Sequence, residues 1–168
     1  MAKGDIRVID PGAGRVEQFQ VQDRTSSSET RAMAHGDAVK RAADGSPYVI
    51  LCATGDPEQG TDKFIGIAMG PSTETTTADG VVSVLVCAPD TVLEAKATTY
   101  ANVDTQSEID DIVGDNVSLD LTTNTFTIDE NEGNDDNVHG FVILGGDPIA
   151  GTLRVRPKSG VLDGYTAL

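Results

Sequence analysis

Tryptophan is absent from this 168-residue chain, and aromatic residues make up only 4% of it. Paired carboxylates such as Asp110 and Asp111 could serve acid–base chemistry on sugars. Sites of that kind normally add aromatic platforms, which this sequence has few residues to build. The shortage of aromatic residues therefore disfavours a glycosidase.

Cysteine is also scarce, with one residue in each of two apolar, strand-like runs. Cys52 lies in residues 48–53 and Cys87 in residues 81–88. A single disulfide between neighbouring strands is one possibility. Two buried thiols in a reducing compartment are the favoured interpretation. Neither cysteine belongs to a CxxC pattern, so no metal or redox role is indicated.

Positive charge is in short supply, since 12 Lys and Arg face 27 Asp and Glu, a formal net charge of −15. Such a chain repels nucleic acids and anionic membrane surfaces. No apolar run approaches the roughly 20 residues of a membrane span. The first ten residues lack the apolar core of a secretory signal. We therefore expect no nucleic-acid partner, no membrane partner and no export by the usual route.

Catalytic motifs are missing as well. His35 and His139 are the only histidines, and both stand in polar, Gly-flanked contexts. Neither a GxSxG elbow nor an HExxH helix occurs. The Gly-rich stretch 11–15 lacks the spacing of a phosphate loop. The sequence accordingly predicts a protein that is not an enzyme and that uses no cofactor.

The densest group of polar ligands is the acidic run 129–137. Calcium binds crowded carboxylate and amide oxygens of this kind. Gly133 stands one position too early for an EF-hand loop, however, and no flanking helices are evident. An acidic hairpin tip without a metal is therefore favoured. The residues to test for cation binding are Asp129, Asn131, Asp135 and Asp136.

From residue 36 onward, short apolar runs alternate with turn residues, a pattern typical of many short strands. Only one helix is indicated. Thr105 and Glu108 form a capping box, and Gly114 is a suitable stop. This order of elements predicts an all-β, mainly antiparallel fold, a compact barrel or sandwich with one short helix.

The first 35 residues carry little apolar patterning, apart from the alternation over residues 16–21. We expect residues 1–35 to form a partly extended N-terminal arm and residues 36–168 to form the β-rich domain. Charge divides along the chain too, with −2 over residues 1–60 and −13 over residues 61–168. A solvated acidic face explains this division. A sharper hypothesis is that one end of the molecule approaches an acidic partner and the other end does not.

Four stretches in the middle of the chain resemble tailed-phage head decoration, or capsid cement, proteins. They are YVILCATGDP at 48–57, GTDKFIGIA at 60–68, TET at 73–75 and DGVVSV at 79–84. The resemblance covers residues 36–98, the family-like core. Residues 99–168, with the helix and the acidic run, would be an acidic elaboration.

The resemblance implies a compact β-barrel or β-tulip-like domain with one short helix. It also implies a non-enzymatic protein of the virion, made in the host cytoplasm, that sits on the outer surface of an HK97-type icosahedral capsid. Such proteins clamp neighbouring capsid subunits against internal DNA pressure, commonly as homotrimers. The implied partners are the major capsid protein and further copies of the chain itself. Trimer contacts would use the apolar runs 81–86 and 141–144. The arm would supply the capsid contacts, and the candidate residues are Arg7, Arg15, Phe19, Val21, Arg24 and Arg31.

Three alternatives stay open at this point. A tail or head-fibre base would share the composition. A calcium-dependent β binding domain would use the acidic run. A trimeric β enzyme of dUTPase-like size would need nucleotide motifs that are not found in the sequence.

Overall fold

The computed structural model describes residues 6–27, 29, 31–43, 46–131 and 138–163. Strands dominate these residues, and the helices are short. The strands are β1 (Arg7–Asp10), β2 (Arg15–Val21), β3 (Ala38–Arg41), β4 (Val49–Leu51), β5 (Phe64–Ala68), β6 (Gly80–Val86), β7 (Val92–Lys96), β8 (Asn116–Thr122), β9 (Thr125–Asp129), β10 (Phe141–Asp147) and β11 (Thr152–Pro157). The helices are α1 (Arg24–Ser27) and α2 (Gln106–Ile112), with 3-10 turns at Tyr100–Asn102 and Ser159–Val161.

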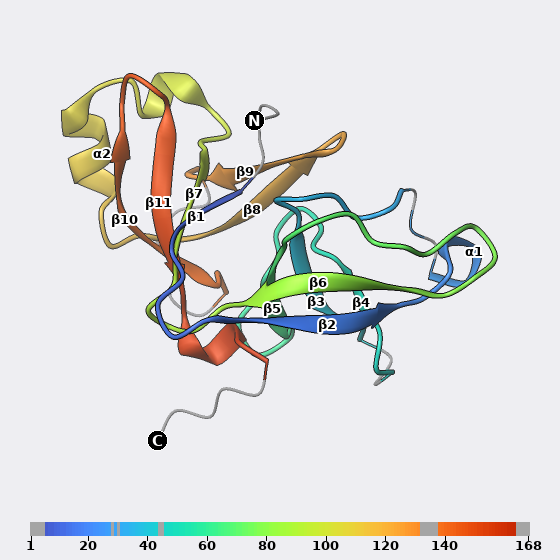
Figure 1. Cartoon of the computed structure of the whole chain (residues 1–168). Coiled ribbons are helices and arrows are strands. Elements are labelled where there is room, and N and C mark those ends of the chain that lie inside the picture. Colours follow the sequence, from blue (N-terminus) through green and yellow to red (C-terminus); the bar gives the residue numbers. More distant parts are fainter. Residues whose placement is uncertain (1–5, 28, 30, 44–45, 132–137, 164–168) are drawn as a thin grey trace.

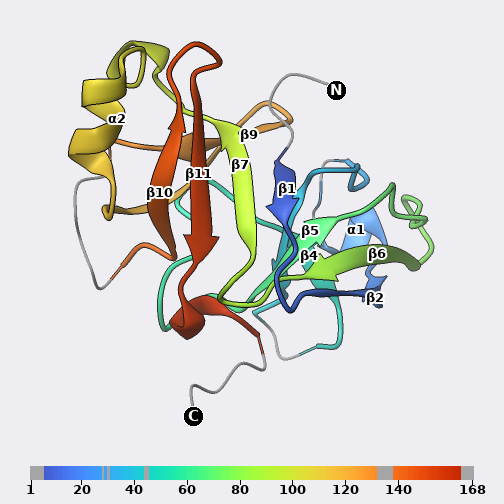
Figure 2. The same ribbon diagram turned by 60° about the vertical axis from the view of Figure 1, so that its left-hand side comes forward.

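The strands form two sheets that lie side by side (Figures 1 and 2). Sheet A has six strands in the order β1-β7-β11-β10-β8-β9, and sheet B has five in the order β2-β6-β5-β3-β4. Every pairing between named strands is antiparallel. The prediction of an all-β, mainly antiparallel fold is thus confirmed.

The N-terminal segment belongs to both sheets and does not lie outside the β-rich body as expected. Its first strand, β1, pairs with β7 at one edge of sheet A, and β2 pairs with β6 over its whole length at one edge of sheet B. Ile6, Val21 and Met33 are buried in the core. The four residues of β1 show no alternation, and their pairing partner lies more than 80 positions away. The sequence pattern therefore gave no sign of this strand.

The boundary between the two sheets falls inside the family-like core, residues 36–98. Sheet B ends with β6 at Val86, and sheet A resumes with β7 at Val92. Residues 92–98 therefore belong with the acidic second part of the chain. The family-like stretches at 48–84 all lie in sheet B or in the loops between its strands.

One hydrophobic core joins the two sheets. Phe64 of sheet B and Phe141 of sheet A are both fully buried, and their rings meet edge to face with centroids 5.2 Å apart. A pair of this geometry contributes about 0.5–1.5 kcal/mol beyond the burial of its area. The apolar runs 81–86 and 141–144, considered for trimer contacts, largely serve this core. Of them, Leu144 is the large side chain that stays exposed.

The predicted helix is present. Thr105 accepts a hydrogen bond from the Glu108 N–H, and the Glu108 carboxylate accepts one from the Thr105 N–H, which completes the capping box. The helix ends just before Gly114, whose φ of 96° suits a residue without a side chain. The prediction of buried cysteine thiols is also confirmed, because Cys52 and Cys87 are both free and buried.

Candidate binding surface

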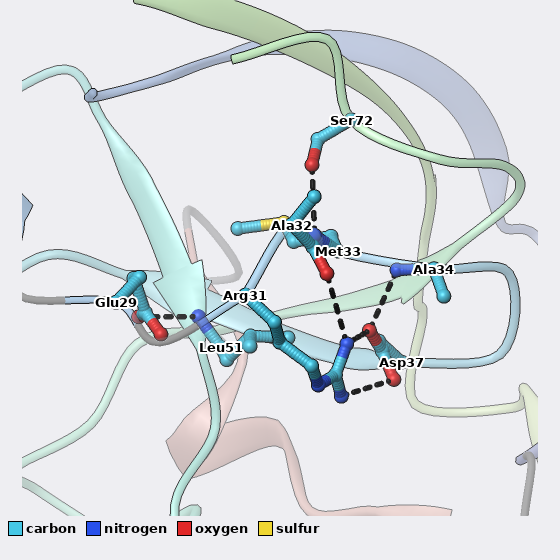
Figure 3. A network of polar contacts seen from close by, with 8 residues as sticks. All are labelled: Glu29, Arg31, Ala32, Met33, Ala34, Asp37, Leu51 and Ser72. Carbon is cyan, nitrogen blue, oxygen red and sulfur yellow. Dashed lines mark hydrogen bonds and ion pairs between the residues drawn. The ribbon is translucent and has the colours of Figure 1, made fainter. Parts of the chain in front are cut away.

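The six candidate capsid-binding residues do not form one surface. Val21 lies in the core. Arg31 is largely buried, and its guanidinium binds Asp37 through two contacts, Nη1–Oδ2 at 2.5 Å and Nη2–Oδ1 at 2.9 Å (Figure 3). Both residues are thus occupied in holding the fold together and are poorly placed to contact a partner.

The surroundings of Arg31 fasten the segment after α1 to sheet B (Figure 3). The Ala34 N–H donates to Asp37 Oδ2 at 2.7 Å, and the Met33 N–H donates to the buried Ser72 hydroxyl at 2.8 Å. On the other side, Glu29 accepts a hydrogen bond from the Leu51 N–H at 3.3 Å. Burial raises the pKa of Glu29 above its usual value.

Arg15, Phe19 and Arg24 lie on β2 and α1, along the edge of sheet B. The Arg15 side chain is 73% exposed and pairs with Glu17. Phe19 is half-buried, and the Arg41 guanidinium lies 5.5 Å above its ring centroid, a cation–π contact. The Arg24 side chain is partly buried, and its backbone N–H donates to the Thr75 carbonyl. These residues face surroundings of mixed charge.

Arg7 belongs to a different group. It forms an ion pair with Glu94 of β7, and Arg154 of β11 approaches the same carboxylate with Nε 3.1 Å from Oε2. The three residues are register partners across β1, β7 and β11. Glu94 is only 7% exposed, while each arginine side chain is 50% exposed. The buried acid therefore holds two guanidinium groups at the surface.

Two further cations share this face of sheet A. Leu153 and Val155 are buried, so Arg154 and Arg156 point together to the outside. Lys96, two residues after Glu94 on β7, also points outward. We call this set the cationic face, and it consists of Arg7, Lys96, Arg154 and Arg156. A pocket adjoins the cationic face at Arg156. It is lined by Pro89, Val142, Arg156, Pro157, Lys158 and Ser159.

The acidic helix α2 packs on the opposite face of sheet A. Gly146 and Leu153 are register partners, so a side chain at Gly146 would point to the same face as Leu153. A Cβ at Gly146 would lie 3.2 Å from both Ile109 of α2 and Leu153. The helix therefore packs on the core side of sheet A, beside β10 (Figure 2). It carries Glu108, Asp110 and Asp111, and the last two are exposed. Sheet A separates the acidic helix from the cationic face.

Sequence reasoning missed three members of this face, namely Lys96, Arg154 and Arg156. The alternation over Thr152–Pro157 was visible, and it places both arginines on one side of a strand. The pairing of β1 with β7 and of β7 with β11 was not visible. Without it, Arg7 could not be placed beside residues that lie about ninety to one hundred and fifty positions further along the chain.

The proposed cation ligands are only partly described. Asp135 and Asp136 lie outside the described residues. Asp129 accepts a hydrogen bond from the Asn131 N–H at 3.0 Å, and the Asn131 amide hydrogen-bonds with Thr99, Glu130 and Asn102. Both side chains thus stabilise the local loop. Within the described ranges, no group of three or more His, Cys, Asp or Glu side chains is arranged to hold a metal ion.

Comparison with known proteins gives no identification. No protein-family model matches the chain, and no curated protein matches it. In the part of the chain that the structure describes, no helix has the length and apolar character needed to cross a membrane.

Proposed function

We propose that the protein is a structural component of a phage virion that binds the outer surface of an icosahedral capsid and stabilises the expanded shell. In this proposal it clamps neighbouring copies of the major capsid protein against the pressure of packaged DNA. It acts without a cofactor and without catalysis. Its copies associate as homotrimers on the shell, after synthesis in the host cytoplasm.

The observation that carries the proposal is the separation of charge across sheet A. Four cations lie on one face of sheet A in a chain of net charge −15. The acidic helix α2 packs against the opposite face of the same sheet. A protein with this arrangement approaches an acidic surface in one orientation, because the opposite orientation brings like charges together. Bound in that orientation, it presents its acidic side to the solvent, where like-charged particles repel one another.

Two further features support a decoration role. The stretches that resemble decoration proteins lie in sheet B and its loops. The small number of charges on the cationic face also suits binding to a capsid. When associated copies bind several neighbouring sites of one lattice, avidity raises the overall affinity even though each single contact is weak. The cationic face replaces the N-terminal arm as the proposed contact, and Arg7 is the residue common to both.

The proposal is tested by adding the purified protein to expanded capsids that lack a decoration protein and sedimenting the particles. We expect saturable binding at a fixed number of copies for each capsid, and a rise in the temperature at which the capsids release their DNA. Binding without saturation, or saturable binding without any protection, would contradict the proposed stabilising role.

A paired variant locates the contact. Arg154→Glu with Arg156→Glu should weaken binding at least tenfold, because two attractive charges become repulsive. The control is Arg15→Glu with Lys63→Glu, which makes the same change of net charge at two exposed sites outside the cationic face. Equal loss in both variants would indicate a response to net charge alone, and the cationic face would then not be the contact.

A further inference from the structure

A largely buried lysine of sheet B lies against two carboxylates of the loop between β4 and β5. The Lys40 Nζ is 2.7 Å from Asp56 Oδ2 and 2.8 Å from Asp62 Oδ1. The Lys40 side chain is 16% exposed, and each aspartate side chain is 11% exposed. Lys40 is the last residue but one of β3, and the two aspartates belong to the loop between β4 and β5.

The two aspartates are held firmly in place around the amine. Asp56 Oδ2 accepts a hydrogen bond from the Ala53 N–H at 2.5 Å, and the Asp56 carbonyl accepts one from the Leu119 N–H of β8 at 2.8 Å. Asp62 Oδ2 accepts a hydrogen bond from the Glu58 N–H at 2.8 Å. The side-chain carboxyl carbon of Asp56, Cγ, is one bond, about 1.2 Å, from Oδ2. The amine therefore lies within about 4 Å of that carbon, close to the 3–3.5 Å of a reactive approach.

The three groups together carry one more acid than base. Two ionised carboxylates beside one ammonium would leave an uncompensated negative charge in a largely buried place, which is unfavourable. Desolvation raises the pKa of Asp56, which favours its protonated form. For Asp62, desolvation is outweighed by the Glu58 N–H and Lys40, and its pKa is lowered. Of the two acids, Asp56 therefore takes up a proton more readily. At Lys40, desolvation is outweighed by the hydrogen bonds to Asp56 and Asp62, which raise the pKa of the amine, so its neutral form is scarce.

From this geometry we propose that Lys40 and Asp56 form an intramolecular amide bond, with Asp62 as the residue that moves the proton. In the molecules in which Asp56 is protonated, the Lys40 ammonium gives a proton to the Asp62 carboxylate, and the neutral amine attacks Cγ of Asp56. This proton transfer is unfavourable, so the reaction is slow. The C–N bond forms and a C–O bond breaks. A water molecule leaves with the hydroxyl group of Asp56 and the second amine proton. Asp62 ends as the neutral acid.

The reaction is a condensation with no oxidation or reduction, so it needs no further reactant. Burial favours it because the Lys40 ammonium and the Asp62 carboxylate both lose their charge, and Lys40 and Asp56 become one neutral amide. The amide would join β3 covalently to the β4–β5 loop. This loop also contacts β8 of sheet A through the hydrogen bond from the Leu119 N–H to the Asp56 backbone carbonyl. The inference concerns the maturation of the chain and does not rest on the proposed function.

The mass of the intact, denatured protein tests this inference. We expect the wild-type chain to be lighter than its sequence by one water, and a proteolytic digest to contain a branched peptide that joins Lys40 to Asp56. Lys40→Arg keeps the positive charge but should have the full mass. Asp62→Asn should reduce the cross-linked fraction at least tenfold.

A second reaction that loses water must be distinguished from this one. Aspartate before glycine, as at Asp79–Gly80, can close to a cyclic imide with the same change in mass. The imide would persist in Lys40→Arg, and the digest would hold only linear peptides. Either that result or a wild-type chain of full mass after prolonged incubation of the folded protein would overturn the proposal.

Discussion

Arg31 and Asp37 form a bidentate ion pair in which the carboxylate is 5% exposed and the guanidinium 19% exposed. Removal of one partner from such a pair leaves the other charge buried and without compensation. The expected cost is about 3–5 kcal/mol. The pair is therefore a structural element of sheet B, although the sequence placed Arg31 among the residues that meet a partner.

The first prediction concerns this pair. Asp37→Ala should lower the free energy of unfolding by about 3–5 kcal/mol, because Arg31 and the Ala34 N–H both lose their acceptor. Urea titration followed by circular dichroism measures the change. Arg15→Ala, which breaks the exposed pair with Glu17, should change stability by less than about 1 kcal/mol. Equal effects in the two variants would mean that Arg31 is solvated.

The second prediction is a pH dependence at Glu29. Because burial raises its pKa in the folded state, ionisation of Glu29 opposes folding. The loss of stability caused by this ionisation is absent below the pKa that Glu29 has in the unfolded chain. It grows as the pH rises toward the higher pKa of Glu29 in the folded protein. Glu29→Gln should therefore be more stable than wild type at pH 7, and the difference should shrink toward pH 4. Thermal denaturation across this range measures it.

Glu58→Gln is the control for Glu29→Gln, because it removes the same charge from an exposed position. The contrary result is a Glu29→Gln variant that is less stable than wild type by the same amount at every pH. In that case the hydrogen bond from the Leu51 N–H would determine the effect of Glu29 on stability, and the burial of its charge would not.

The third prediction concerns the start of α2. Thr105→Ala removes the hydroxyl that accepts the Glu108 N–H, and it should cost about 1 kcal/mol of stability. Thr105→Ser retains the hydroxyl and should restore most of the loss. A Ser variant as unstable as the Ala variant would show that the methyl group of Thr105, and not the cap, carries the effect.

The fourth prediction concerns the thiols. Burial raises the pKa of Cys87 to about 12 and raises that of Cys52 well above its usual value. Because the thiolate is the reactive form, neither should react with a thiol reagent at pH 8 while the chain is folded. In denaturant both should react. Fast labelling of the folded protein would contradict the buried placement of these residues.

Local patterns predicted much of the secondary structure. The apolar alternation over residues 16–21 gave β2, and Thr105 with Glu108 and Gly114 gave both ends of α2. The turn residues 122–125, which lie between the alternating run 117–121 and the run 126–128, likewise predict the hairpin of β8 and β9, and its register pairs run from Ser118↔Asp129 to Thr122↔Thr125. Each of these features depends on residues close together in sequence.

Such local patterns did not predict which residues far apart in the sequence lie together in the fold. The sequence did not show that Arg7 and Arg154 meet at Glu94, because strand pairing follows from the packing of the whole core. It likewise gave no reason to place Lys40 beside Asp56 and Asp62. The burial of Arg31 was missed for a related reason. An arginine in a polar stretch resembles a surface residue until its buried partner is known.

The most direct test of the account is a cryo-electron-microscopy reconstruction of phage particles that carry this chain. The account predicts density for the protein at regular positions on the outer capsid surface, with Arg7, Arg154 and Arg156 toward the shell and α2 toward the solvent. Density confined to the tail or a vertex fibre, or copies on the shell with α2 against the capsid, would contradict it.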